Sequence, residues 1–345
     1  ELEGVRLQGS MAESLPKRRR APCSGGPSVP AAGPARLRAL LAREGGLTLL
    51  GCYDCLTAKA IQEAGFEACF MSGYAVSASR LGMPDVGLCT YSEMVDCAAS
   101  ICRCVGESLC VIGDGDTGYG GLSNLRRTVE GYARVGLAGI TIEDQVFPKR
   151  CAYANGVEVV PREEAVLHLR AALMARDEMR ARTGLDLVVV GRTDARRAAA
   201  HPEPLEEALS RCAAFEELGA DVVYAEGLQS PEEMQALHAR LKRSTPTLLA
   251  QVEGGTSVGM LTAADAGKLG FKLCLFGVTL LNAQLCTARR VTQDISAGCH
   301  PEVGTDLLPF KELYAAVGFD EVYAWEARAT ASPSGNGDKK AGHST

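Results

Sequence analysis

Residues 109–116 read LCVIGDGD, and the glycine-rich segment TGYGG follows at residues 117–121. The run LCVI is uninterruptedly apolar, which is typical of a parallel strand that is buried on both faces. On such a strand, residues i and i+2 point to the same face, so Asp114 and Asp116 are predicted to lie side by side. Two adjacent carboxylates are costly to bury without a partner, and a cation that prefers oxygen ligands, such as Mg²⁺, would offset that cost. The alternative is a polar turn that only ends the strand.

The same arrangement recurs along the whole chain. Helical segments are predicted at residues 161–183, 205–218 and 231–241, because these segments begin with proline or acidic residues and two of them stop before glycine. Short apolar runs alternate with such segments, and eight alternations predict an α/β fold, a (β/α)₈ TIM barrel. The apolar runs, each followed by polar residues or glycine, are residues 47–50, 68–71, 109–112, 139–142, 187–190, 222–225, 248–252 and 273–276.

Composition divides the chain into four segments. Residues 1–34 are rich in proline, glycine and serine and contain the basic run 17–20, so we expect a disordered tail there. The catalytic barrel is expected at residues 35–300. A C-terminal helical extension is expected at 301–328, where apolar residues from Leu307 to Tyr323 recur with near-helical spacing. Residues 329–345 are expected to form a second disordered tail.

The bulk composition excludes several classes of protein. The 345 residues are 46% hydrophobic and 23% charged, as in soluble globular proteins. The net charge of −6 argues against nucleic acid as a partner, and no apolar run approaches the roughly 18 residues that a membrane span needs. The fourteen cysteines are scattered, which indicates free thiols in a reducing compartment. We therefore expect a cytoplasmic protein; import into a plastid or mitochondrion through residues 1–34 is an alternative that the acids in this tail weaken.

Polar side chains follow almost every predicted strand. In a barrel of this kind the carboxyl ends of the strands meet at one face, where active sites lie. Helix caps would explain one or two of these positions, but not so many ionisable groups together. The eighth strand is followed by the uncharged residues 277–279. The other strand ends carry Tyr53 and Asp54; Ser72, Gly73 and Tyr74; Asp114 and Asp116; Glu143 and Asp144; Arg192 and Asp194; Glu226; and Gln251 and Glu253.

The loop after the fourth predicted strand contains Cys151 directly after two cations, Lys149 and Arg150. Neighbouring positive charge lowers the pKa of a cysteine thiol, so this pattern indicates a reactive thiol. The alternative is a surface loop with an incidental cysteine. A zinc or redox site at Cys52 and Cys55 is disfavoured, because a second cysteine pair at the right spacing and nearby histidines are missing.

Seven motifs stand in a fixed order along the chain: SGY at residues 72–74, LGMPD at 81–85, DGDTGYGG at 114–121, IEDQ at 142–145, PKRC at 148–151, GRTDA at 191–195 and VEGG at 252–255. In type and order they resemble the motifs of the isocitrate lyase/phosphoenolpyruvate mutase superfamily. The resemblance covers roughly residues 37–325. It looks greatest to the branch that contains methylisocitrate lyase, petal death protein and carboxyvinyl-carboxyphosphonate phosphorylmutase.

The resemblance implies an enzyme that uses Mg²⁺, with Mn²⁺ as the alternative metal, and that acts on a small 2-hydroxy or 2-keto di- or tricarboxylate. Asp114 would hold the metal, supported by Asp116 and Glu143. Cys151 would give a proton to an enolate intermediate, Tyr74 would be the candidate base, and Lys149 would be a further catalytic residue of the same loop. Arg192 would act in catalysis too, clamping a carboxylate or the enolate oxygen. The residues implied to bind the substrate are Ser72, Gly73, Tyr74, Asp85, Arg192, Glu226 and Gln251.

Three positions depart from the family pattern. Ala152 and Tyr153 stand where the lyase branch has glycine and histidine after the loop cysteine, and Gln251 stands where the family usually has asparagine. A tyrosine can donate a hydrogen bond but carries no positive charge at neutral pH. We therefore expect a shifted substrate preference.

The leading hypothesis is a lyase that cleaves a carbon–carbon bond. One alternative is a mutase or hydrolase of the phosphonopyruvate or carboxyphosphonate type; phosphonopyruvate enzymes lack a cysteine at the position of Cys151, whereas the carboxyphosphonate branch keeps a similar loop. Another is a catalytically weakened barrel that serves as an oligomeric binding protein, which the intact acids and Arg192 oppose. A homodimer or homotetramer is expected, because the last helix of family members often swaps onto a neighbouring subunit; a helix packed on its own barrel is the alternative.

Overall fold

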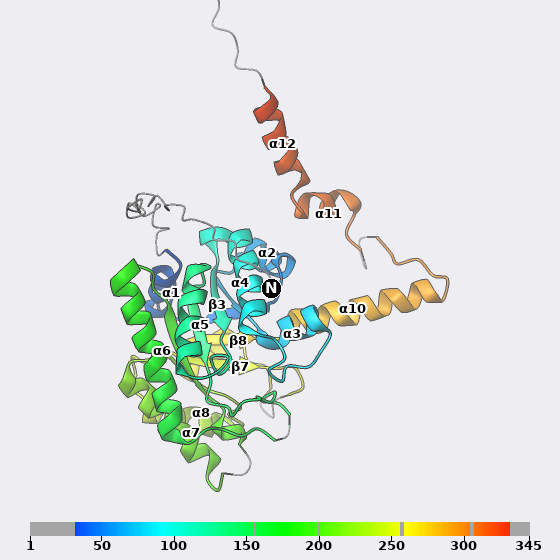
Figure 1. The fold of residues 1–345 in the computed structure, drawn as a ribbon. Coiled ribbons are helices and arrows are strands. Elements are labelled where there is room, and N and C mark those ends of the chain that lie inside the picture. Colours follow the sequence, from blue (N-terminus) through cyan, green and yellow to red (C-terminus); the bar gives the residue numbers. More distant parts are fainter. Residues whose placement is uncertain (1–31, 155, 199–200, 256–258, 304–306, 332–345) are drawn as a thin grey trace, which may run out of the picture.

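The computed structural model describes residues 32–154, 156–198, 201–255, 259–303 and 307–331. Within them, eight parallel strands close into a barrel in sequence order, and β8 pairs with β1 (Figure 1). The predicted (β/α)₈ barrel is thus confirmed, and each predicted apolar run overlaps a strand, with Leu109, Leu187 and Val252 just outside. The strands are β1 Leu47–Cys52, β2 Ala68–Met71, β3 Cys110–Asp114, β4 Gly139–Ile142, β5 Val188–Thr193, β6 Val222–Ala225, β7 Thr247–Gln251 and β8 Leu273–Phe276.

Helices surround this barrel on the outside (Figure 1). Two helices, α3 and α4, connect β2 to β3, whereas the other connections between neighbouring strands carry one α-helix each. The helices are α1 Ala32–Ala42, α2 Cys55–Glu63, α3 Gly73–Leu81, α4 Tyr91–Val105, α5 Leu122–Arg134, α6 Arg162–Thr183, α7 Pro204–Leu218, α8 Pro231–Arg240, α9 Ala263–Lys268, α10 Thr279–Ser296, α11 Phe310–Ala316 and α12 Phe319–Thr330, with short 3₁₀ turns at Gly106–Ser108 and Ala195–Arg197.

The barrel interior is filled by apolar side chains from alternate strand residues. Leu37 and Leu40 of α1 join this inner core and close the amino-terminal end of the barrel. The alternation continues toward the carboxyl ends of the strands, where Asp114 follows Ile112 and Arg192 follows Val190 at a spacing of two residues. The fold therefore places a polar layer at the mouth of an otherwise apolar barrel.

The N-terminal boundary differs from the prediction. Helix α1 begins at Ala32, inside the last three residues of the predicted tail 1–34. Pro34 lies in the first turn of this helix, where its missing N–H removes no helical hydrogen bond. The rest of that tail, like residues 332–345 of the second one, lies outside the described residues.

The C-terminal extension contains two helices, not one continuous apolar stripe. Gly318, with φ +87°, separates α11 from α12. No side chain of α10, α11 or α12 is buried among the described residues, and Figure 1 shows these helices leading away from the barrel. The alternative of a helix packed on its own barrel is therefore wrong for α11 and α12 in the single chain.

No helix in the described part of the chain is long and apolar enough to cross a membrane. The cysteines of the described ranges are all free.

Candidate active site

A cavity of about 750 Å³ opens at the carboxyl ends of the strands. Ten of the twelve residues to which the resemblance gave a catalytic, substrate-binding or metal-binding role line it, although they come from six different strand ends and loops; Gly73 and Asp116 do not line it. The polar lining residues include Ser72, Tyr74, Asp85, Asp114, Glu143, Gln145, Lys149, Arg150, Cys151, Tyr153, Arg192, Glu226 and Gln251.

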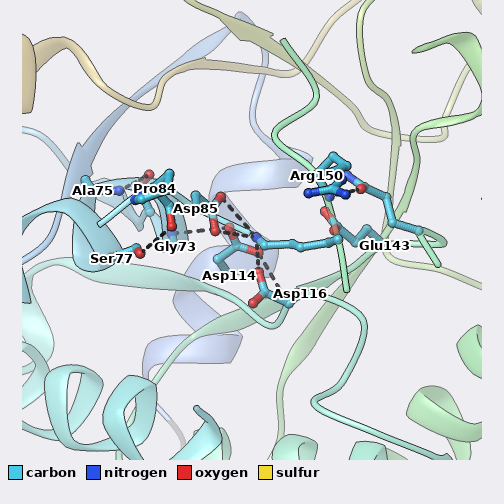
Figure 2. Close-up of polar contacts among 12 residues, drawn as sticks. Gly73, Ala75, Ser77, Pro84, Asp85, Asp114, Asp116, Glu143 and Arg150 are labelled. Atoms are coloured by element: carbon cyan, nitrogen blue, oxygen red, sulfur yellow. Dashed lines mark hydrogen bonds and ion pairs between the residues drawn. The ribbon is translucent and has the colours of Figure 1, made fainter. Parts of the chain in front are cut away.

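A buried acidic cluster forms one wall of this cavity. Figure 2 shows Asp85, Asp114 and Asp116 turned toward one another. The ammonium group of Lys149 lies between them: Nζ is 2.9 Å from Asp85 Oδ1 and also pairs with Asp116 Oδ1. The Lys149 side chain is only 4% exposed, so a full charge is held here by its carboxylate partners.

The backbone brings Asp114 and Asp116 together in a way that the sequence did not predict. Strand β3 ends at Asp114, and Asp116 follows in a turn with φ +46°. Asp116 therefore lies outside the strand, and strand alternation does not explain why the two aspartates lie close together. Aspartate tolerates this left-handed conformation, and the Asp116 amide donates to Asp114 Oδ1 at 3.2 Å. Both carboxylates still lie close together, since the Asp114 carboxylate accepts from the Asp116 amide and the Asp116 carboxylate accepts from Lys149.

Gly73 makes room for this cluster. A Cβ atom at this position would lie 2.8 Å from Asp114 Oδ2 and 3.4 Å from Asp116 Oδ1. The Gly73 amide donates to Asp114 Oδ2 at 3.2 Å, and Ser72 accepts a bond from the Ala75 amide as the N-cap of α3. The Gly73 amide, at a position predicted to bind the substrate, thus orients Asp114, and the Ser72 hydroxyl caps α3.

Burial dominates the ionisation of the acidic cluster. It raises the pKa of Asp116 to about 7, against the opposing effect of the Lys149 charge. Burial likewise raises the pKa of Glu143 well above its usual value, although the nearby Arg192 charge lowers it. For Lys149, burial lowers the pKa, but Asp116 and Asp85 outweigh this and raise it above the ordinary value. The cluster therefore has more acidic groups than its single ammonium can neutralise.

The donor set of this cluster fits a hard divalent cation. Four carboxyl groups, from Asp85, Asp114, Asp116 and Glu143, surround one ammonium, and all their ligand atoms are oxygens, as Mg²⁺ prefers. Glu143 Oε1 is buried and has no hydrogen-bond partner among the described residues, which is the state of a ligand atom whose partner is a cation. Within the described ranges, however, no three acid, histidine or cysteine side chains are already arranged so that they could hold a metal ion.

Arg192 also lines the cavity. Its Nε and Nη2 atoms donate to the two oxygens of Asp194, each at 2.9 Å. Glu143 Oε2 lies 3.4 Å from Nε, and Glu226 Oε2 lies 3.5 Å from Nη2. Such a bidentate partner fixes the plane of the guanidinium. Arg192 is therefore oriented by Asp194 and faces the cavity between two further carboxylates.

Glu226 is held by two phenols. Tyr153 Oη donates to Oε1 at 3.0 Å, and Tyr224 Oη donates to Oε2. Sequence reasoning overlooked Tyr224, although its spacing of two residues from Glu226 on the same inward face was a usable signal. The tyrosine that replaces the family histidine thus commits its hydroxyl to Glu226.

The thiol of Cys151 lines the cavity and is half-buried. Burial raises its pKa, which corrects the prediction that neighbouring cations lower it. Burial outweighs the charge of Arg192, which lowers this pKa, and Asp85 and Glu226 raise it further; the Lys149 ammonium pairs with Asp116 instead. The Cys151 thiol is therefore protonated at neutral pH, as a proton donor must be.

Of the other predicted residues, some line the cavity and others make structural contacts. Tyr74 lines the cavity and is 41% exposed. Gln251 also lines it, but its amide group bonds to the backbone of Leu261 at 2.7 and 2.9 Å. Asp54 caps α2, and Asp144 accepts from Arg211 Nη1 at 2.9 Å. The last two strand-end acids are therefore structural.

Comparisons with known proteins identify the family of this chain. The family model for phosphoenolpyruvate phosphomutase matches residues 37–296. The chain is 36% identical to 2,3-dimethylmalate lyase of Eubacterium barkeri over 296 residues, which cover 84% of this chain and 95% of that protein. It is 34% identical to 2-methylisocitrate lyase of Halalkalibacterium halodurans over 290 residues, covering 84% of this chain and 91% of the relative.

Among solved structures, oxaloacetate acetylhydrolase in complex with the inhibitor 3,3-difluorooxalacetate superposes with a TM-score of 0.79 at 32% identity, covering 88% of this chain and 99% of that one. The resemblance that the seven motifs indicated is thereby confirmed. The chain belongs to the isocitrate lyase/phosphoenolpyruvate mutase superfamily and is an enzyme of this family, whose named relatives are lyases and mutases.

Proposed function

We propose that this protein is a Mg²⁺-dependent lyase that cleaves a carbon–carbon bond in a small 2-hydroxy or 2-keto dicarboxylate and forms an enolate. One observation carries the proposal. A buried acidic cluster, an oriented Arg192 and a protonated Cys151 thiol line a single cavity of about 750 Å³. Folding alone does not require ionisable groups to converge in this way.

Asp114, with Asp116 and Glu143 acting directly or through water, would hold the cation. When bound, Mg²⁺ would stabilise the negative charge that develops on an enolate oxygen. Mn²⁺ shares the preference for oxygen ligands and is the alternative ion.

The chain's own residues supply the remaining chemistry. Arg192, fixed by Asp194, donates hydrogen bonds to a substrate carboxylate or to the enolate oxygen. In a 2-hydroxy substrate, the hydroxyl proton passes to a base, for which Tyr74 is the proposed group; in a 2-keto substrate, water first adds to the carbonyl and supplies this hydroxyl. As the carbon–carbon bond breaks, its electrons form the enolate, and the Cys151 Sγ proton then passes to the enolate carbon. Lys149 offsets the charge of Asp85 and Asp116 beside this reaction.

The residues that replace the family pattern support a dicarboxylate as the substrate. Tyr153 carries no positive charge, and its hydroxyl already donates to Glu226. Lys149 is committed to the acidic cluster, which leaves Arg192 and Arg150 as the cations of the lining. A substrate with two carboxylates matches this charge better than one with three. The names of two similar proteins, a dimethylmalate lyase and an oxaloacetate acetylhydrolase, support the same class.

The experiment is a substrate panel with Mg²⁺, in which the products formed from substituted malates, oxaloacetate, methylisocitrate and phosphonopyruvate are identified and quantified by mass spectrometry. We expect turnover of a dicarboxylate, and a loss of about 100-fold or more in kcat for Cys151→Ser with product binding retained. The matched control is Cys286→Ser, because Cys286 is an exposed cysteine of α10. Turnover of phosphonopyruvate alone, or full activity of Cys151→Ser, would refute the proposal.

We also propose that the chain forms a homodimer or homotetramer through its C-terminal helices. Their aromatic residues are exposed in the single chain, with Phe310 at 78% and Trp325 at 63%. Such a contiguous apolar surface is unfavourable in water and indicates a protein partner. Sedimentation at micromolar concentration tests this, since a monomer at that concentration would contradict it.

A further inference from the structure

Arg197 lies behind the cavity, in the 3₁₀ turn that follows β5. It contacts the two loop positions that directly follow Cys151. Its Nε donates to the Ala152 carbonyl at 2.6 Å, and its guanidinium carbon lies 5.5 Å from the centre of the Tyr153 ring. A guanidinium over an aromatic face and a charge-assisted hydrogen bond are both attractive, so one side chain holds two consecutive loop residues.

The surroundings leave space for this arrangement. A Cβ atom on Gly227 would lie 2.2 Å from Arg197 Cδ, so the lack of a side chain there lets Arg197 pass. A Cβ atom on Gly255 would lie 3.2 Å from Tyr153 Cδ1. The Tyr153 ring is therefore confined by Gly255 as well as by Arg197, while its hydroxyl is anchored on Glu226 at 3.0 Å.

We propose that Arg197 is a positioning residue that fixes the segment 151–153 against the barrel and thereby holds the Cys151 thiol over the cavity. The inference rests on the proposed function only for its catalytic consequence, namely that Cys151 donates the proton. Arg197 itself does not line the cavity. Its effect on the reaction passes through Ala152 and Tyr153.

The test compares Arg197→Met with Arg197→Lys and with Arg196→Met in the full-length protein. Arg196 is the matched control, because it is the neighbouring residue but pairs with Glu233 at 2.7 and 2.9 Å and not with the loop. Two readouts are used: the rate at which iodoacetamide alkylates each cysteine, resolved by peptide mass spectrometry, and kcat and KM separately.

We expect Arg197→Met to accelerate alkylation of Cys151 several-fold, because the thiol loses its fixed and half-buried position. The same variant should lower kcat by about 10- to 100-fold with a small change in KM, since a misplaced catalytic group costs rate more than binding. Arg197→Lys restores a charge and a donor but not the planar stacking, so it should lie between Arg197→Met and the wild type. In Arg196→Met, the rate of alkylation at Cys151 should equal that of the wild type.

Two results would overturn the inference. One is an unchanged Cys151 alkylation rate in Arg197→Met. The other is a general rise that includes the buried Cys212, which would mean that Arg197 supports the barrel as a whole. If Arg197→Met does not fold, the same comparison is made with Arg197→Lys alone. Full activity of Cys151→Ser would refute the proposed proton donor, but the alkylation rates would still decide the role of Arg197.

Discussion

Replacing Lys149 by methionine removes the only ammonium from the acidic cluster while keeping an unbranched side chain of similar length. In the native protein, Lys149 Nζ pairs with Asp85 and Asp116 while its side chain is 4% exposed. Breaking a buried ion pair from one side typically costs 3–5 kcal/mol, because the remaining charge is left uncompensated. We expect about 3 kcal/mol here, the lower end of that range, because Asp116 has a pKa of about 7 and can take up a proton.

The expected loss depends on pH, and its sign follows from linkage. Without the ammonium, the pKa of Asp116 in the folded state rises further above that of the unfolded chain. The folded variant then binds more protons than the unfolded one, so its stability falls as pH rises. The difference between the wild type and Lys149→Met should accordingly be larger at pH 8 than at pH 6.

Thermal unfolding followed by circular dichroism, with chelator present, measures this difference. A loss of about 3 kcal/mol corresponds to a decrease in Tm of about 6–12 °C for a domain of this size. Added Mg²⁺ should raise the Tm of the variant more than that of the wild type, because a cation supplies the missing charge. Lys268→Met is the control: Lys268 is 77% exposed and pairs with Asp265 at 2.7 Å, so it should change little. Equal Tm values for Lys149→Met and the wild type at pH 8 would refute the reasoning.

Two further predictions concern ionisation and packing. The affinity for Mg²⁺ should weaken by about tenfold from pH 8 to pH 6, because Asp116, with its pKa of about 7, must lose its proton to bind a cation. Calorimetry at both pH values measures this affinity. Equal affinities at the two pH values would contradict the prediction. Arg211→Met should destabilise the fold by about 3–5 kcal/mol, since Arg211 is buried and pairs with Asp144 at 2.9 Å and Glu207 at 2.7 Å; guanidinium chloride unfolding checks this, with the exposed Arg240→Met as control.

The strands were predictable because each is an uninterrupted apolar run, and such runs occur in chains whose parallel strands are covered on both faces. The polar layer followed from the same alternation. Arg192 comes two residues after Val190, and Glu226 two residues after Tyr224, so both point into the barrel mouth. Local periodicity was thus sufficient to predict the fold and most of the residues that line the cavity.

Contacts between distant loops were not predictable from periodicity. Lys149 reaches Asp116 across 33 residues, and its position there is why the charge expected beside Cys151 acts elsewhere. The left-handed turn at Asp116 depends on a hydrogen bond to Asp114 that no spacing rule encodes. The break at Gly318 was visible as a glycine, but the near-helical spacing of apolar residues on both sides concealed it.

We propose above that the acidic cluster holds a cation that stabilises the negative charge of an enolate. Calorimetric binding of oxalate, a planar dianion that resembles an enolate, tests it most directly in the wild type and in Asp114→Asn, each with and without Mg²⁺. We predict that the wild type binds oxalate about 100-fold or more tightly with Mg²⁺ than without it, and that Asp114→Asn loses this difference. Equal oxalate affinity with and without Mg²⁺, or a Mg²⁺ effect that survives in Asp114→Asn, would contradict the claim.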